Sequence, residues 1–278
     1  MPISNDPLFL PVASLIHQTA RITAKARRNL ATLRIETKGD DSPVTEADHA
    51  SEAALTTGLQ IILPGSKVLG EETCPPGTGW QSPLIKSRGN IWTVDPIDGT
   101  RPFIKGGEYG IMVALRQNRK TTAAWIYYPV TKDMLFASAQ DIHAKYITHF
   151  GAARQNVRDI TQIPSLETAH IKLEYYPLKN KIPEKYRLKK LFGKAEECIC
   201  IATATRSLIL RGDTAVISEH VLTPWDDVPT RFIAAKAGAP AARDISGRLF
   251  RDGSESNILA PTRSVMQQIL SSIRAASV

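Results

Sequence analysis

The sequence predicts an α/β (α+β) fold in which helices alternate with strands of mixed direction. Apolar residues recur at helical spacing over residues 8–33 and again in the segment that begins at Thr45. Two apolar runs, 110–116 and 123–128, are separated by a short polar stretch, which is typical of an antiparallel hairpin. Helical and hairpin patterns in one chain favour a fold with packed layers of both kinds.

Length and composition fit a globular protein. The 278 residues predict a single domain, 1–278, with a first half of about 1–150 and a second half of about 151–278. Hydrophobic residues make up 42% and charged residues 22%, which is ordinary for such proteins. No apolar stretch approaches the length of a membrane-spanning helix, and the N-terminus lacks the pattern of a secretory signal. We therefore expect no membrane partner.

Cysteine usage indicates the cellular compartment, and the net charge indicates which kinds of binding partner to expect. Cys74, Cys198 and Cys200 are odd in number and form no C-x-x-C pair, which favours the reducing cytoplasm and argues against a disulfide framework or a zinc site. The formal charge of +8 would favour anionic substrates. Basic residues are spread along the chain except in 185–194, and no aromatic nucleic-acid motif accompanies them, so we expect no nucleic-acid partner.

The first half is predicted to hold two helices and most of a sheet. Residues 8–33 form the first helix, and residues 38–43 a mobile loop. Thr45 and Asp48 resemble a capping box at the start of the second helix, which ends at Pro64-Gly65. The expected strands are 67–69, a strand from Asn90 stopped by Pro96 and Gly99, the hairpin 110–116 and 123–128, and 134–137 with 145–148; residues 74–89 connect two neighbouring strands over the surface.

The second half has a more polar composition and weaker patterns. Its segment 156–194 contains several prolines, and we expect one strand and one basic helix there. Beyond it, apolar runs and helix signals resume, with a helix opening at Pro224-Trp225 and ending at Gly238. The expected elements are a strand at 169–173, a helix at 183–192, a strand at 198–201, a helix at 205–211, a strand at 215–218 leading to Glu219, and helices at 224–237 and 264–275.

The acidic turn after the strand at Asn90 is the main functional signal. Asp95 and Asp98 lie three residues apart on a turn stiffened by Pro96, so both carboxylates can point at one spot. Two such charges repel unless a cation lies between them, and a hard divalent cation suits oxygen ligands. Thr100 adds a hydroxyl beside that spot, and the N–H groups of residues 99–101 could receive a phosphate.

A plain structural interpretation competes with this one. Asp-Gly is among the commonest turn dipeptides, and the spacing does not match a helix–loop–helix calcium site. Two more acidic turns follow other elements, Glu71-Glu72 after a strand and Asp226-Asp227 at a helix start. Each of them alone is explained as a cap or a turn. Three such turns together favour a shared cation site.

Together with Lys38, Thr45 and Asp48, these turns form a recognisable series. Gly70-Glu71-Glu72, the string from Trp92 to Thr100 (W-T-V-D-P-I-D-G-T) and Trp225-Asp226 occur in a set order. In these motifs the chain resembles the inositol monophosphatase family of magnesium-dependent, lithium-sensitive phosphatases, over nearly all of its length. The resemblance implies a layered αβαβα sandwich of the sugar-phosphatase type, and a homodimer.

The resemblance also implies roles for individual residues. Two or three Mg²⁺ ions would be held by the metal ligands Glu71, Asp95, Asp98, Asp226 and the backbone carbonyl of Ile97. The catalytic residues would be Glu71, Thr100 and Asp95, with Thr100 and Glu71 positioning the attacking water. Substrate would contact Asp98, Gly99, Thr100, Ala202, Glu219 and Asp226.

Three departures from the family pattern concern the substrate side. Cys200-Ile201-Ala202 replaces a Gly-Ser/Thr-Ala turn, Val228-Pro229-Thr230 replaces Ala-Ala-Gly, and Pro102 stands where Asn or Glu is usual. None of them removes a metal ligand. We therefore expect the metal and phosphate chemistry to be kept and the substrate to be the open question.

The favoured hypothesis is a Mg²⁺-dependent phosphomonoesterase that acts on a small sugar or polyol phosphate, such as inositol monophosphate. Alternative enzymes are a 3′(2′),5′-bisphosphate nucleotidase, since Arg101 follows Thr100 here, a fructose-1,6-bisphosphatase, or a histidinol phosphatase. The alternative outside enzymology is a family member that binds RNA or transcription factors through its basic surface. Residues near Cys200 and Glu219 would discriminate between the substrates.

Overall fold

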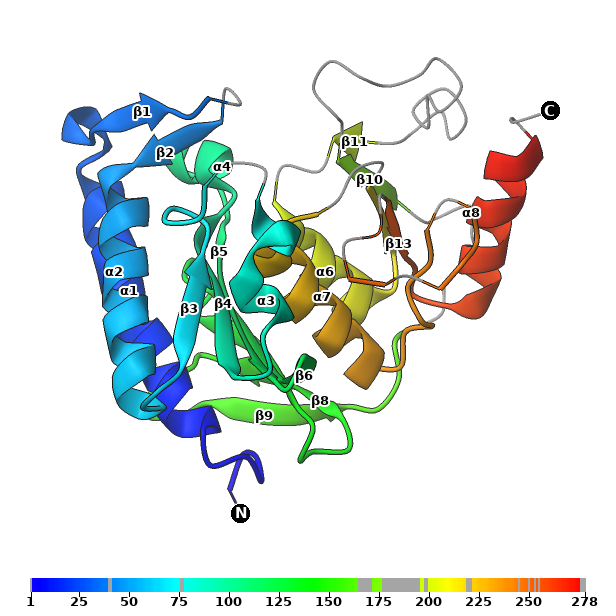
Figure 1. The fold of residues 1–278 in the computed structure, drawn as a ribbon, viewed down its shortest axis with the longest axis horizontal. Coiled ribbons are helices and arrows are strands. Elements are labelled where there is room, and N and C mark those ends of the chain that lie inside the picture. The colour runs from blue at the N-terminus through cyan, green and yellow to red at the C-terminus, as the bar shows by residue number, and fades with distance from the viewer. Residues whose placement is uncertain are drawn as a thin grey trace.

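A seven-stranded mixed sheet dominates the first half of the chain (Figure 1). The computed structural model describes residues 2–39, 42–75, 78–164, 172–176, 196–197, 200–218, 222–244, 246–249, 251–252, 254 and 256–275. The strands follow each other in chain order across the sheet, and only the first pair, β3 and β4, is parallel. They are β3 (Lys67–Gly70), β4 (Asn90–Asp98), β5 (Gly110–Gln117), β6 (Lys120–Tyr128), β7 (Asp133–Ser138), β8 (Ala144–Thr148) and β9 (Asn156–Ile160).

Both faces of this sheet are covered, which explains why its strands read as apolar runs. Side chains alternate along β5, so that Ile111 and Val113 face helices α1 (Phe9–Arg28) and α2 (Glu46–Ile62). Met112 and Ala114, which alternate with them along the strand, face α6 (Ile201–Arg211) and α7 (Pro224–Lys236). The sheet therefore lies between two helical layers.

A second, smaller sheet lies beyond α6 and α7 and is covered outside by α8 (Arg263–Ala275) (Figure 1). The layer order is α1 with α2, the seven-stranded sheet, α6 with α7, the second sheet, and α8. This confirms the predicted layered αβαβα sandwich. The second sheet has the order β11-β10-β12-β13, with β10 (Lys172–Tyr176), β11 (Glu196–Glu197), β12 (Thr214–Ser218) and β13 (Asn257–Leu259).

The predicted helix starts near Thr45 and at Pro224 are confirmed, whereas the helix predicted at 205–211 begins earlier, at Ile201. Thr45 is the N-cap residue of α2. Its backbone N–H donates to Asp48 Oδ2 at 2.8 Å, which completes the capping box. The first helix is shorter than predicted, because α1 ends at Arg28 and a single 3₁₀ turn, η1 (Leu30–Thr32), follows. None of the helices within the described residues has the length and hydropathy needed to cross a membrane.

Several predicted boundaries were wrong. The strand at Asn90 was expected to stop at Pro96, but β4 continues through it to Asp98 at an irregularity where a missing N–H is tolerated. The strand predicted at 198–201 was wrong at its end, because Cys200 caps α6 and Ile201 begins it. β9 was missed because four of its five residues are exposed and show no apolar pattern. The predicted helix 183–192 lies outside the described residues.

The predicted loop 38–43 joins a short hairpin that the sequence did not indicate. β1 (Ile35–Thr37) and β2 (Pro43–Thr45) pair in antiparallel fashion on either side of it. β1 is exposed at all three positions, so no hydrophobic alternation marks it. Residues 74–89 connect the neighbours β3 and β4, as predicted, and contain η2 (Gly79–Gln81) and the short helix α3 (Pro83–Lys86).

The turn after β3 is held by a carboxylate from α2. Glu52 is buried and accepts hydrogen bonds from the N–H groups of Glu72 at 2.7 Å and Thr73 at 2.9 Å. Gly70 makes room for it, since a Cβ atom there would lie 2.3 Å from Glu52 Cδ. The position of Glu71 thus depends on a glycine and a buried acid.

We expect Gly70→Ala to lower the free energy of unfolding by about 2 kcal/mol, because the new methyl group overpacks the site of Glu52. Urea unfolding measures the change. Gly39→Ala is the matched control, because a Cβ at Gly39 meets nothing within 4 Å. Equal unfolding midpoints for the two variants would contradict the prediction.

Candidate metal centre

Three buried carboxylates from two distant segments meet at the end of β4. Asp95 and Asp98 lie on β4, and Asp226 lies in the first turn of α7. Their exposed fractions are only 2%, 6% and 8%. One oxygen from each lies within 4.8 Å of the others. The structure therefore brings together three of the five predicted metal ligands.

An irregularity in β4 explains why Asp95 and Asp98 share one side. Residues three apart on a regular strand point to opposite faces. Here Asp95 pairs with Met112 and Asp98 with Gly110, so the strand carries one extra residue between them. A bulge of this kind re-aims the side chains that follow it, and so both carboxylates turn to the same spot.

The N-terminus of α6 binds Asp98 from behind. The Ala202 N–H donates to Asp98 Oδ2 at 2.6 Å, and the Ile201 N–H donates to Oδ1 at 3.2 Å. The Cys200 thiol adds a third donor at 3.0 Å from Oδ2. The departure Cys200-Ile201-Ala202 thus contacts a predicted metal ligand directly. Ala202, predicted to contact substrate, is fully buried and packs against Gly110.

Asp95 and Asp226 have local partners of their own. Asp95 Oδ1 accepts the Ile97 N–H at 2.9 Å, and Asp226 Oδ2 accepts the hydroxyl of Thr223 at 2.8 Å. One carboxylate oxygen of Asp95 also lies within 4.8 Å of one of Asp226. Two buried carboxylates this close are a natural place for a cation to bind.

Glu71 lies beside the three aspartates and is paired with a lysine. Lys38 Nζ lies 2.7 Å from Glu71 Oε1 and 2.8 Å from Glu72 Oε1. The negative charge of Glu71 helps to raise the pKa of Asp95 and of Asp226. Glu71 is therefore close enough to act on the cluster, although its oxygens are not among those that converge within 4.8 Å.

The electrostatics of the cluster favour a cation. Burial first, and then the neighbouring carboxylates, raise the pKa of Asp95 and Asp226 well above the ordinary value. Burial likewise raises the pKa of Asp98 to about 6. Buried carboxylates of like charge this close together are stable only when one of them is protonated or when a cation binds to them. The metal-ligand atoms of Asp95, Asp98 and Asp226 are all carboxylate oxygens, so the cluster suits a hard ion such as Mg²⁺.

A threonine and a fourth buried aspartate adjoin the cluster. Thr100 Oγ1 lies 3.3 Å from Asp48 Oδ1 and 3.2 Å from the carbonyl oxygen of Ile97. Burial raises the pKa of Asp48 to about 6. The contact with Thr100 was not predicted, because the capping box with Thr45 already explained an aspartate at this position. No separate signal in the sequence pointed to it.

The predicted phosphate-binding turn begins the short helix α4 (Thr100–Ile104). Gly99 precedes it with φ of 89°, a left-handed conformation that glycine adopts without strain. A Cβ atom at Gly99 would also lie 3.0 Å from the Cβ of Cys200. The turn therefore requires glycine for two reasons. Glu219, predicted to contact substrate, lies outside the described residues.

We expect the metal-free protein to lose stability as the pH rises from about 4 to about 6. The pKa of Asp48 and of Asp98 is about 6 when folded, against about 4 when unfolded, so the folded chain binds more protons in this window. Bound Mg²⁺ would replace those protons and restore about 2.7 kcal/mol at a hundred times its Kd. Urea midpoints with EDTA and with Mg²⁺, near pH 5 and near pH 7, measure the effect. A Mg²⁺ effect of equal size at both pH values would contradict it.

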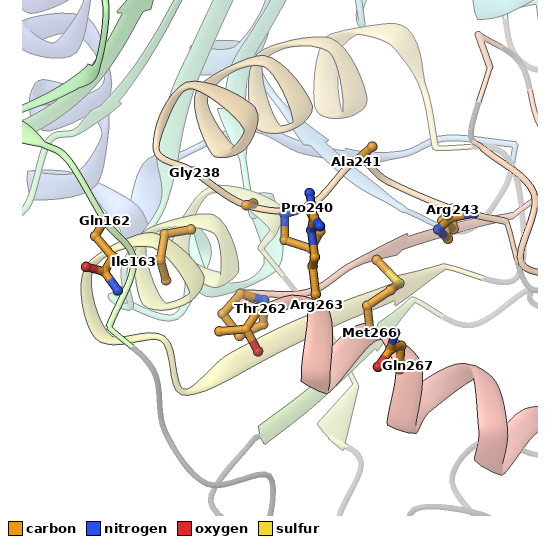
Figure 2. A pocket seen from close by; sticks show the side chains of 12 residues that line it. Gln162, Ile163, Gly238, Pro240, Ala241, Arg243, Thr262, Arg263, Met266 and Gln267 are labelled. Atoms are coloured by element: carbon orange, nitrogen blue, oxygen red, sulfur yellow. The ribbon is translucent and has the colours of Figure 1, made fainter.

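A separate cleft of about 750 Å³ lies in the second half of the chain (Figure 2). Its described lining includes Gln162, Gly238, Arg243, Thr262, Arg263 and Met266, and none of the described lining residues is acidic. Gly238 follows the C-terminal end of α7, whereas Asp226 lies at its N-terminal end. Gly238 lies twelve positions after Asp226, most of them helical, which corresponds to about 18 Å. The cleft is therefore not part of the acidic cluster.

Comparisons with known proteins give the family and the fold of the chain. Residues 9–277 match the family model described as "Inositol monophosphatase family". The 3′(2′),5′-bisphosphate nucleotidase CysQ of Salmonella typhimurium is 40% identical over 102 residues, which span 36% of this chain and 39% of that protein. The chain thus spans about two fifths of the length of this curated relative.

Solved structures show the same fold. The extragenic suppressor protein SuhB of Bartonella henselae superposes with a TM-score of 0.77 at 18% identity, covering 97% of this chain and 99% of that one. A protein described as IMPase/NADP phosphatase complexed with Mg²⁺ and phosphate superposes with a TM-score of 0.69 at 18% identity, covering 91% and 90%.

Proposed function

Because the chain belongs to the inositol monophosphatase family, we propose that it is a Mg²⁺-dependent phosphomonoesterase that hydrolyses a small sugar or polyol phosphate. The observation that carries this proposal is the convergence of Asp95, Asp98 and Asp226, with oxygens within 4.8 Å of one another in a buried site. A cluster of this kind is too costly to keep as a structural feature alone. Its donor chemistry fits the ion that the family uses.

Glu71, Asp95, Asp98, Asp226 and the carbonyl of Ile97 would hold two or three Mg²⁺ ions. When bound, Mg²⁺ supplies charge neutralisation for phosphate oxygens and lowers the pKa of water. Asp98 is oriented for this role by three donors from the start of α6. Asp226 is oriented by Thr223. Such partners fix the direction of a metal ligand.

Thr100 and Asp48 are placed to handle a proton. The single Thr100 hydroxyl hydrogen has two acceptors within reach, Asp48 Oδ1 at 3.3 Å and the Ile97 carbonyl at 3.2 Å. With the Ile97 carbonyl turned to a metal ion, the hydrogen would go to Asp48, which leaves the lone pairs of Thr100 Oγ1 for another donor. We assign that donor as the attacking water, which Glu71 helps to position. The N–H groups of Gly99 and Thr100 would hold the phosphate at the start of α4. The family relationship would make Asp226 and Glu219 contacts of the substrate, whereas Ala202 is fully buried and its N–H is bonded to Asp98.

A bisphosphate nucleotide is a second candidate substrate. The 40% identity to the nucleotidase CysQ favours it, over a stretch of 102 residues. Arg101, directly after Thr100, is exposed and could meet a second phosphate. A cationic side chain next to the reacting phosphate would favour a substrate with two anionic groups.

Phosphate release from a panel tests the proposal. The panel is inositol 1-phosphate, fructose 1,6-bisphosphate, 3′-phosphoadenosine 5′-phosphate and histidinol phosphate, each with Mg²⁺ and with EDTA. We expect one substrate to be hydrolysed well, only with Mg²⁺. No hydrolysis of any of them by folded, Mg²⁺-binding protein would overturn the proposal.

The family relationship supports three further parts of the proposal. Li⁺ would inhibit the enzyme by competing for the acidic cluster. Two copies would form a homodimer. A cytoplasmic location agrees with the free thiols of Cys74 and Cys200. Inhibition by Li⁺ and the mass in solution test the first two directly.

A further inference from the structure

A second set of buried charges adjoins the acidic cluster without belonging to it. Asp227 follows Asp226 in α7 and is completely buried. It is bonded to Arg231 in the same helix and to Asn257 on β13, and Arg231 links it in turn to Asp252 and Arg116. We call this set the α7 network; its members are Arg116, Asp227, Arg231, Asp252 and Asn257.

Both oxygens of Asp227 are used within the network. Arg231 Nε, one turn later in α7, donates to Asp227 Oδ2 at 2.8 Å. Asn257 Nδ2, on β13, donates to Asp227 Oδ1 at 2.8 Å. The first bond lies within the helix, whereas the second ties the helix to the second sheet. Asn257 therefore provides an external anchor for the first turn of α7.

The outer part of the network ties α7 to the first sheet. Asp252 accepts from Arg231 Nη2 at 2.9 Å and from Arg116 Nη2 at 2.6 Å. Arg116 is a buried residue of β5 whose guanidinium lies over the Trp80 ring, 5.8 Å from its centroid. Two arginines and two aspartates balance their charges. Burial raises the pKa of Asp227 to about 6, and the nearby arginines oppose that rise, so Asp227 is ionised at neutral pH.

The first turn of α7 needs such anchors because its own hydrogen bonding is interrupted. Pro229 lies inside the helix and has no N–H to donate to the carbonyl of Trp225. Successive helical residues are about 100° apart around the axis, so a bond that fixes Asp227 also fixes the direction of Asp226. Among the described residues, the side-chain hydrogen bond that orients Asp226 comes from the hydroxyl of Thr223, a single contact.

Stability alone does not explain the network. Asn257 Oδ1 and Arg116 Nε are buried without a hydrogen-bond partner in the described part of the chain. Each unpaired buried group costs about 1–3 kcal/mol. An apolar pair at these positions would avoid that cost. The chain keeps polar groups where they control the orientation of a helix turn.

We propose that Asp227 and Asn257 are positioning residues, which hold the first turn of α7 so that Asp226 faces Asp95 and Asp98. The proposal rests on the metal site of the proposed function. The Asn257–Asp227 hydrogen bond joins β13 to α7. It orients the metal ligand Asp226, although neither of its two residues contacts the metal or the substrate.

The sharpest test adds a negative charge at the Asp227–Asn257 contact and then exchanges the two groups. Asn257→Asp sets two carboxylates face to face at the present 2.8 Å contact, and we expect Mn²⁺ binding to weaken roughly ten-fold. The double variant Asp227→Asn with Asn257→Asp exchanges the two groups and restores an amide–carboxylate bond. We expect it to regain most of the affinity. Mn²⁺ binding is measured by the electron paramagnetic resonance of the free ion, without substrate.

Two comparisons separate positioning from stability. Asp159→Asn breaks the Lys145–Asp159 ion pair of 2.7 Å between β8 and β9, and should leave Mn²⁺ binding unchanged. If Asn257→Asp does not fold, Asn257→Ala removes the anchor without adding a charge and should weaken binding in the same direction. Urea midpoints are recorded for every variant, because a purely structural role would move them and leave the affinity of folded protein alone.

The outcomes distinguish this proposal from the proposed function. Native affinity in folded Asn257→Asp or Asn257→Ala would overturn the positioning role and leave the phosphatase proposal standing. Equal weakening in the single and double variants would also overturn it. Absence of Mn²⁺ binding by the native chain would overturn both.

Discussion

Asp95→Asn is expected to lower Mg²⁺-dependent phosphate release roughly a thousand-fold, because it removes the carboxylate at the centre of the cluster. Burial, and then the charges of Glu71, Asp226 and Asp98, raise the pKa of Asp95. An amide keeps the shape but offers one neutral oxygen. Initial rates on the substrate identified by the panel, with saturating Mg²⁺, measure the loss.

The same substitution is expected to stabilise the metal-free protein. Removal of one charge from a buried group of like charges relieves repulsion, so the urea midpoint in EDTA should rise near neutral pH. Asp213→Asn is the matched control, since it breaks the Arg211–Asp213 ion pair at the end of α6 and leaves the cluster intact. Loss of activity together with a lower midpoint would indicate misfolding and contradict the prediction.

Thr100→Ala is expected to lower kcat roughly a hundred-fold, because no hydroxyl remains between Asp48 and the attacking water. Thr100 is half-buried at the start of α4, and its hydroxyl contacts only Asp48 Oδ1 and the Ile97 carbonyl among the described residues. Removing it should leave the fold intact. Steady-state kinetics separate kcat from KM.

Thr100→Ser is the matched control, since it keeps the hydroxyl and loses only a methyl group. We expect it to retain activity within a small factor of the native chain. If Thr100→Ala were as active as Thr100→Ser, the hydroxyl would have no part in the reaction. If both were inactive, the methyl contact and not the proton path would be the important feature.

Many helices and strands could be predicted because their signals are local, whereas the layered arrangement was implied by the resemblance to a family. The capping box of Thr45 and Asp48, the hairpin of β5 and β6 and the helix start at Pro224 are each written in a few neighbouring residues. The acidic turns could be predicted as one site because the motifs around Asp95 and Asp226 occur together. The prediction that these turns lie close together in space depended on the resemblance to a family.

Other parts of the site have no local signal. The extra residue in β4 between Asp95 and Asp98 follows from pairing with β5. The bond between Thr100 and Asp48 joins residues 52 positions apart, and the bond between Asp227 and Asn257 joins residues 30 positions apart. Pairing of Lys38 with Glu71 depends on the hairpin of β1 and β2, whose residues are too exposed to show a pattern. Such contacts arise only when the layers assemble.

Calorimetric titration of Mg²⁺ in two buffers of different ionisation enthalpy tests the metal site most directly. Near pH 6, carboxyl groups such as Asp98, with a pKa of about 6, are partly protonated, so binding should release protons into the buffer. We predict Mg²⁺ binding with proton release by the native chain, and little binding by Asp95→Asn. Equal binding by the two proteins, or none by the native chain, would contradict the assignment of this cluster as a metal centre.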